Sequence, residues 1–152
     1  LAHGDPASDL PAVILALDAD LVVRGAGGER TIAAAEFFTG LWQTAMGPAE
    51  MLVEVRVPKL GSSAGWSYVK MARRAQDWAT VGVAAVVEKS NGSLGRARIG
   101  LTNMGATPIR AATAEEAIEG GASAEDASQR IADGAEPRSD HAASSEFRRH
   151  LS

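Results

Sequence analysis

Hydrophobic and polar residues alternate strictly along residues 51–57. A period of two is typical of a strand that buries one face and exposes the other. Val53, Val55 and Val57 share one side of this segment, and we expect that side to face the core. Pro58 cannot donate a backbone hydrogen bond, so the strand should end there.

The residues before this strand predict a short helix and a hairpin. Residues 9–17 begin with Asp and Pro and continue with mostly apolar residues, which is typical of the start of a buried helix. Residues 21–24 and 30–32 are predicted strands, and the glycine-rich segment 25–29 between them is predicted to be a tight turn. Residues 33–38 should open a small helix.

The second half begins with a meander of strands. We expect strands at residues 66–73, 79–88 and 96–102, the last of which alternates between apolar and polar positions. A turn at residues 90–93 joins the last two. Because the connections are short, the three strands should form one antiparallel sheet. The Gly- and Ser-containing segment 59–65 ahead of them is a predicted loop and domain boundary.

Alanine-rich helices follow Pro108. Residues 113–116 have the sequence of a capping box, and residues 123–126 a similar start. Residues 144–152 also begin like a helix, with serine caps, and stop after barely two turns. Residues 59–152 are therefore predicted to be an α+β unit in which a three-stranded antiparallel sheet packs with a helical bundle.

Composition excludes several classes of function. The chain of 152 residues has a net charge of −4 and no basic stripe, which argues against nucleic-acid and anionic-membrane binding. It has no apolar run long enough to span a bilayer. Without cysteine, the chain cannot ligate an iron–sulfur cluster through thiolates, and this fits a reducing, cytoplasmic compartment. The three histidines are far apart in sequence, and we expect no metal site.

Charged residues gather directly ahead of the buried strand at 79–88. We call residues 70–78 the charged corner; its polar and aromatic members are Lys70, Arg73, Arg74, Asp77 and Trp78. Polar groups at the mouth of a rigid strand are well placed to build a site. A solvated hairpin rim would have the same composition, and the sequence alone leaves both interpretations open.

Asp9 is a second candidate, just ahead of the first predicted helix. Its carboxylate could accept a hydrogen bond from a ligand hydroxyl, or Ser8 or Asp9 could simply cap the helix. Lys70 could contact a ligand or lie along the surface with its amine in water.

Five short segments in order give the chain a family resemblance. They are LAHGDPASDLP at 1–11, EVRVP at 54–58, GWSYVK at 65–70, RRAQDWA at 73–79 and LTNMGATP at 101–108. Together they resemble the FAD-binding medium subunit of the molybdenum hydroxylases. The likeness is strongest to the aerobic carbon monoxide dehydrogenase type, within the broader xanthine dehydrogenase family.

The resemblance implies how the chain is divided. Residues 1–58 would be the end of a two-subdomain FAD-binding domain, its second subdomain, and residues 59–152 the C-terminal domain of the flavoprotein. The family's glycine-rich pyrophosphate loops lie upstream of the position of Leu1, and the last helix looks cut short. We therefore expect a fragment truncated at both ends and inactive by itself.

The resemblance also implies a cofactor, site residues and partners. Asp9 would hydrogen-bond the polar chain of FAD, Lys70 would lie by the isoalloxazine ring, and backbone near Met46 would border it. Arg73, Arg74, Asp77 and Trp78 would form a loop against the ring, with no catalytic acid or base. Electrons would come from [2Fe-2S] clusters on a small subunit and a molybdenum cofactor on a large subunit. The alternative is a non-catalytic module that docks partner subunits and binds no flavin by itself.

Overall fold

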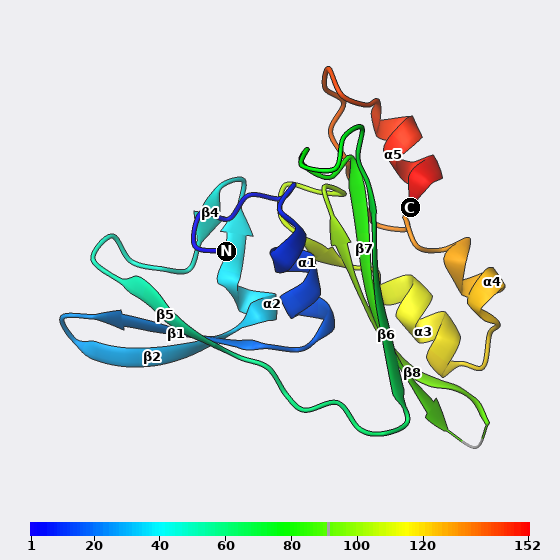
Figure 1. Cartoon of the computed structure of the whole chain (residues 1–152), viewed down its shortest axis with the longest axis horizontal. Helices are drawn as coiled ribbons and strands as arrows, with labels where there is room; N and C mark the ends of the chain where they lie inside the picture. The colour runs from blue at the N-terminus through cyan, green and yellow to red at the C-terminus, as the bar shows by residue number, and fades with distance from the viewer. Residues whose placement is uncertain (91) are drawn as a thin grey trace.

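The structure, a computed structural model, describes residues 1–90 and 92–152. The first part of the chain forms a sheet with strand order β2-β1-β5, a two-stranded β3-β4 ribbon and two helices (Figure 1). Its elements are α1 (Asp9–Ala16), β1 (Asp20–Gly25), β2 (Gly28–Ala33), α2 (Ala34–Phe37), β3 (Phe38–Gly40), β4 (Gln43–Thr44) and β5 (Met51–Arg56). The predicted first helix, hairpin and small helix are confirmed.

Strand β5 does not bury the side that its alternation predicted. Leu52 and Val55 pack against the core of the first part, whereas Val53 is 39% exposed and Val57 is 48% exposed and lies beyond the strand. The cause is a β-bulge, because the pairing of β1 with β5 passes over Val53. An extra residue in one strand shifts the alternation by one position, so the prediction for Val53 is wrong. The prediction for Val57 is wrong because the strand ends before it, and the prediction for Val55 is confirmed.

The second part contains a larger antiparallel sheet. Its strands are β6 (Ala64–Met71), β7 (Val81–Ser90), β8 (Ser93–Thr102) and β9 (Ile109–Arg110), in that order across the sheet. The predicted meander is confirmed, and the two-residue β9 adds a short fourth strand that the sequence did not signal. The predicted turn at 90–93 includes Asn91, which lies outside the described residues.

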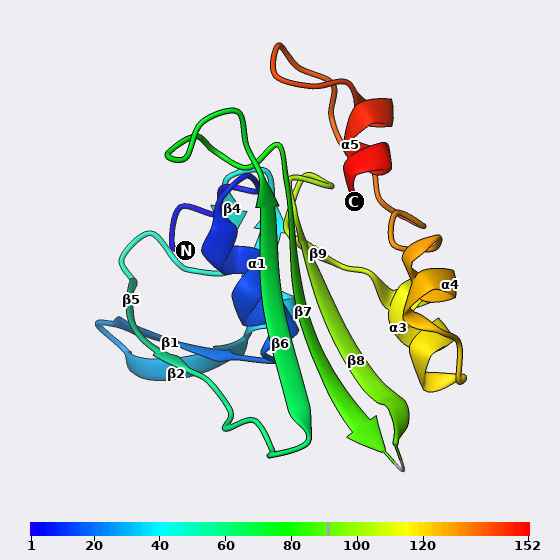
Figure 2. The ribbon, with the colours of Figure 1, turned by 45° about the vertical axis from the view of Figure 1, so that its right-hand side comes forward.

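Helices cover both faces of this sheet (Figure 2). The helices α3 (Ala112–Glu119), α4 (Ala124–Ser128) and α5 (Ser145–Leu151) lie on one side, and α1 lies on the other. Successive side chains of a strand point to opposite faces. In β7, Ala84 and Val86 pack under α1, while Val83 and Ala85 pack in the cluster below α3. The α+β class is confirmed, and α1 joins the two parts.

The predicted capping box at residues 113–116 is not formed. Helix α3 starts at Ala112, and no side chain caps its first turn. The Glu115 carboxylate instead accepts the backbone N–H of Ile99 at 2.6 Å and is paired with the guanidinium of Arg110, also at 2.6 Å. Glu115 thus fastens α3 to the sheet. The predicted caps at Ser123 and Ser144 are confirmed, since each accepts a backbone N–H from the first turn of its helix.

Two arginines hold the C-terminal end of α1 against the second part. Arg98 donates from Nε to the carbonyl of Ala16 at 3.1 Å, and Arg110 donates to the carbonyl of Leu15 at 3.2 Å. Asp18, directly after the helix, pairs with Arg110 at 2.8 Å and lies 3.5 Å from Arg98. The bond to Ala16 gives a partner to a carbonyl at the end of the helix, and the bond to Leu15 adds to the one that this carbonyl accepts from the Asp18 N–H. Both bring cations to the negative end of the helix dipole.

The contact of α1 with β8 predicts a sharp difference between two strand glycines. A Cβ at Gly100 would overlap the backbone carbonyl oxygen of Ala12, whereas a Cβ at Gly65 would meet nothing within 4 Å. We expect Gly100→Ala to lower the free energy of unfolding by at least about 2 kcal/mol, because backbone cannot move aside cheaply. Gly65→Ala should change it by less than about 0.5 kcal/mol. Denaturant unfolding of both variants checks this, and equal stabilities would show that α1 does not lie on β8.

Candidate functional site

One carboxylate gathers two side chains from a distant strand. Asp9, at the first position of α1, accepts the hydroxyl of Tyr68 at 2.8 Å through Oδ1 and pairs with Lys70 Nζ at 2.9 Å through Oδ2. Tyr68 and Lys70 are two residues apart in β6, so both point toward α1. The side chains of Asp9 and Lys70 remain 38% and 24% exposed, so the cluster opens to solvent.

This geometry decides between the two interpretations of Asp9. Ser8 is the N-cap residue of α1, and no side chain makes a capping hydrogen bond there. The Asp9 carboxylate is turned toward β6 instead of toward its own helix. The capping interpretation is therefore wrong, and the ion pair shows that Lys70 is not simply extended along the surface.

The environment of Tyr68 raises its pKa to about 12. Partial burial is the main cause, because it disfavours the phenolate, and the negative charge of Asp9 adds to it. The nearby Thr102 hydroxyl offsets part of the rise, although in the described part of the chain it has no partner with hydrogen-bond geometry. Tyr68 therefore remains a neutral donor to Asp9 at physiological pH.

The rest of the charged corner is exposed. Arg73 donates to the carbonyl of Ala142 at 3.0 Å, and Arg74 pairs with Asp77 at 3.3 Å within the turn itself. An exposed pair of this kind contributes little to stability. Trp78 is 67% exposed. The structure thus joins Lys70 to Asp9 and leaves the two guanidinium groups and the indole at the surface.

Met46 lies in a different setting. Its side chain is partly buried against the core cluster of the first part, together with Leu1 and around Phe37. The backbone of Gly4 also runs close to Gln43, since a Cβ at Gly4 would lie 3.1 Å from the Gln43 nitrogen. Met46 therefore flanks the N-terminal segment that leads to Asp9, and a ligand contact at its backbone stays a prediction.

Sequence reasoning missed two residues near this cluster. The signal for Tyr68 was present, because a residue two positions from Lys70 in a predicted strand shares its face. Arg148 had no such signal, since nothing in the sequence of a terminal helix marks an arginine as buried. It is 1% exposed, pairs with Asp140 at 2.8 Å and donates to the carbonyls of Arg138 and Thr80. It fixes α5 against the start of β7.

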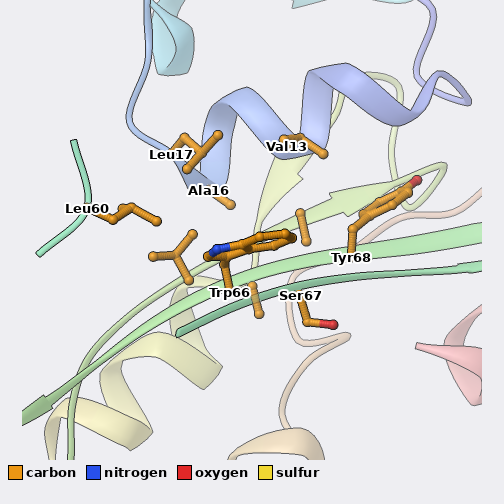
Figure 3. A pocket seen from close by; sticks show the side chains of 10 residues that line it. Val13, Ala16, Leu17, Leu60, Trp66, Ser67 and Tyr68 are labelled. Carbon is orange, nitrogen blue, oxygen red and sulfur yellow. The ribbon is translucent and has the colours of Figure 1, made fainter. Parts of the chain in front are cut away.

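A pocket of about 310 Å³ lies beside the cluster, between α1 and the sheet (Figure 3). Trp66 and Tyr68 of β6 point toward the helix, and Val13 and Leu17 face them. The lining contains no charged side chain. Tyr68 connects the pocket to the charged pair, because it lines the pocket and donates its hydroxyl to Asp9.

Among residues 1–90 and 92–152, no group of three His, Asp or Glu side chains could hold a metal ion. No helix within these residues is long and apolar enough to cross a membrane.

Comparison with protein families accounts for most of the chain. Residues 1–60 match the FAD-binding domain of molybdopterin dehydrogenases, and residues 66–152 match the CO dehydrogenase flavoprotein C-terminal domain. The chain belongs to the family of FAD-binding medium subunits of molybdenum hydroxylases. The recognised resemblance is confirmed, and the cofactor of this family is FAD.

Individual relatives agree with this family. The medium chain of carbon monoxide dehydrogenase from Hydrogenophaga pseudoflava is 39% identical over 89% of this chain. The caffeine dehydrogenase subunit beta from a Pseudomonas species is 39% identical over 72% of the chain. The chain spans 47% and 38% of the lengths of these two relatives, so it corresponds to about half of the first.

Solved structures have the same fold. The chain superposes on a carbon monoxide dehydrogenase structure from Hydrogenophaga pseudoflava with a TM-score of 0.92, at 40% identity. It superposes on quinoline 2-oxidoreductase from Pseudomonas putida 86 with a TM-score of 0.88, at 29% identity. Each match covers 99% of this chain and a little over half of the other, 54% and 53%.

The residues of the cluster fit the chemistry of a flavin. A flavin has a polar sugar chain, a polar pyrimidine edge and a flat aromatic ring. Asp9 and Lys70 supply one partly exposed acceptor and one donor, and the exposed indole of Trp78 offers a flat apolar face. Cofactor sites commonly combine a few polar groups with aromatic side chains in this way.

Tyr68 is the only tyrosine of the chain, so its ionisation can be followed directly. The phenolate absorbance at 295 nm should remain low at pH 10.5 while the protein is still folded, because the pKa is raised to about 12 from a usual value near 10. Stability from this neutral hydroxyl is complete below about pH 10 and is lost as the pH rises toward 12. Asp9→Asn should lower the midpoint. A wild-type midpoint near 10 with native circular dichroism would contradict the partly buried hydrogen bond between Tyr68 and Asp9.

Proposed function

We propose that this chain is part of the flavin electron-transfer subunit of a molybdenum-containing hydroxylase or dehydrogenase, passing electrons from [2Fe-2S] clusters through FAD to an acceptor. The observation that carries the proposal is the Asp9–Lys70 pair. Asp9 comes from the FAD-binding match and Lys70 from the flavoprotein C-terminal match, and they meet at 2.9 Å. We also retain the division at residues 58 and 59 as a proposal; it falls in the irregular segment between β5 and β6.

FAD, when bound, supplies the redox chemistry, and the residues of the chain supply position and charge. Lys70 brings a cation to the site, and the Asp9 carboxylate holds that cation in place. The charges of Lys70 and Asp9 nearly cancel at long distance. The electrostatic potential that the pair imposes on a bound flavin therefore depends on which of the two charges is nearer to it. Asp9 retains exposed oxygen surface with which to accept a hydroxyl of the ligand.

The charged corner would cover the site from one side. Trp78 presents an exposed aromatic surface, and Arg73 and Arg74 present cations that remain in water. The indole of Trp78 can stack on the flat isoalloxazine ring of the flavin. The guanidinium groups can attract the electron-rich, polar edge of that ring. No acid or base is required of these residues.

The proposed partners are inferred from the family. The 152 residues contain no cysteine, so none of them can ligate an iron–sulfur cluster through a thiolate. We propose a small iron–sulfur subunit and a large subunit with the molybdenum cofactor as partners, and the cytoplasm as the compartment. The names of the relatives, such as medium chain and subunit beta, support an assembly of several subunits.

A docking module without flavin is the second candidate. The observation in its favour is the edge strand β6, which carries exposed Trp66, Val69 and Met71. Apolar residues on an unpaired strand edge are typical of protein contacts. Substitution at these residues would disturb subunit assembly in that case, whereas substitution of Asp9 or Lys70 would have no effect on flavin.

Opposite substitutions in the ion pair test the proposal. In the flavin-loaded protein, Lys70→Met should lower the midpoint potential of the flavin because a cation that stabilises added negative charge is lost. Asp9→Asn should raise it because an anion is lost. Shifts of about 20–60 mV correspond to about 1–3 kcal/mol for a two-electron couple.

Lys59→Met is the matched control, because Lys59 is an exposed lysine of the loop before β6. It should leave the potential unchanged. Equal potentials in wild type, Lys70→Met and Asp9→Asn, measured by spectroelectrochemistry, would remove the pair from the flavin site.

A further inference from the structure

Asn103 bridges two segments that are far apart in the sequence. It directly follows β8 and has a left-handed backbone, with φ at 61°. Its backbone N–H donates to the carbonyl of Pro6 at 2.7 Å, and its side-chain Nδ2 donates to the carbonyl of Ala79 at 2.8 Å. Asparagine is among the few residues other than glycine that adopt this conformation at modest cost.

The two acceptors belong to the segments that carry the candidate site. Pro6 lies three residues before Asp9, and Ala79 directly follows Trp78. Both segments lie at the same end of the larger sheet (Figure 2). The next carbonyl, that of Thr80, accepts a hydrogen bond from buried Arg148. The exit of the charged corner is therefore held by two side chains, whereas the corner itself is largely exposed.

We propose that Asn103 is a positioning residue that sets Trp78 relative to Asp9. This inference rests on the proposed flavin function and extends it to a residue outside the charged corner. The side-chain amide of Asn103 holds Ala79 at the end of the charged corner. The backbone N–H of the same residue holds Pro6 ahead of Asp9. A displacement of either loop is then passed to the other through a single partly buried residue.

Asn103 lies outside the paired strands, so its role in positioning the loops can be distinguished from a contribution to the stability of the whole domain. Its two bonds reach irregular segments, and the pairing of β8 with β7 ends at Thr102, one residue earlier. Loss of the side chain leaves the strand ladder intact. The side-chain amide of Asn103 therefore affects the relative position of the two loops more than it affects the stability of the sheet.

Two substitutions isolate the side chain without straining the backbone. Asn103→Gly keeps the left-handed conformation and the N–H bond to Pro6 and removes only the donor to Ala79. Asn103→Asp keeps the size of the side chain and places a carboxylate oxygen against a carbonyl oxygen, so it should act more strongly than Asn103→Gly. Ile118→Val, in the buried cluster on the opposite face of the sheet, is the control for a general loss of stability.

Hydrogen exchange on the flavin-free protein gives the first measurement. Asn103→Gly should raise exchange about 2- to 12-fold at residues 5–8 and 77–80, the range expected for one lost hydrogen bond, and leave residues 81–88 unchanged. The FAD dissociation constant should rise by a similar factor, with a changed visible circular dichroism of the bound flavin. Asn103→Asp should exceed both effects, and Ile118→Val should show neither.

The outcomes separate this inference from the proposed function. Unchanged exchange in both loops of Asn103→Gly and Asn103→Asp would overturn the positioning role. The positioning role would also be overturned if the two Asn103 variants exchange faster but keep the wild-type FAD dissociation constant, while Asp9→Asn and Lys70→Met weaken FAD binding. If none of the four variants alters FAD binding, the flavin function fails and this inference fails with it.

Discussion

The structure depends on the close approach of α1 to the larger sheet. The carbonyl of Ala12 lies where any side chain at Gly100 would begin, so the helix meets the backbone of β8 directly. Burial of Ala12 and Ala16 against Ala84 and Val86 fills the rest of this contact. Small residues on both surfaces make the approach possible, and close packing makes it nearly inflexible. A helix that belongs by sequence to the first part is thereby built into the core of the second.

The contact of α1 with the sheet brings both ends of the helix within hydrogen-bond distance of strand side chains. At the C-terminal end, Arg98 and Arg110 bind the last carbonyls of the helix. At the N-terminal end, Asp9 reaches Tyr68 and Lys70. A helix of eight residues is about 12 Å long, so the two sets of bonds act on one short rigid body. The positions of the arginines therefore influence the Asp9 carboxylate even though they do not touch it.

Helices, strands and turns could be predicted from the sequence, whereas the pairing partners of distant strands and side chains could not. The helix at 9–17, the hairpin and the meander follow from periodicity, turns and caps, which act over a few residues. The bulge at Val53 depends on the partner strand, so alternation alone placed Val53 on the wrong side. The capping box predicted at residues 113–116 likewise did not form, since α3 starts at Ala112 and Glu115 binds Arg110 and the backbone of Ile99. The family resemblance named Asp9 and Lys70, but their mutual ion pair across 61 positions appears only in three dimensions.

The ion pair also changes what a cation at this site can do. An unpaired Lys70 would impose its full field on any neighbouring group, whereas a pair imposes only the difference between two nearby charges. That difference is set by geometry, and the geometry is set by α1 on one side and β6 on the other. Small movements of α1 therefore alter the field more than they alter the stability of the pair, which is modest for partly exposed groups. Packing of Gly100 against Ala12 thus becomes part of the electrostatics of the site.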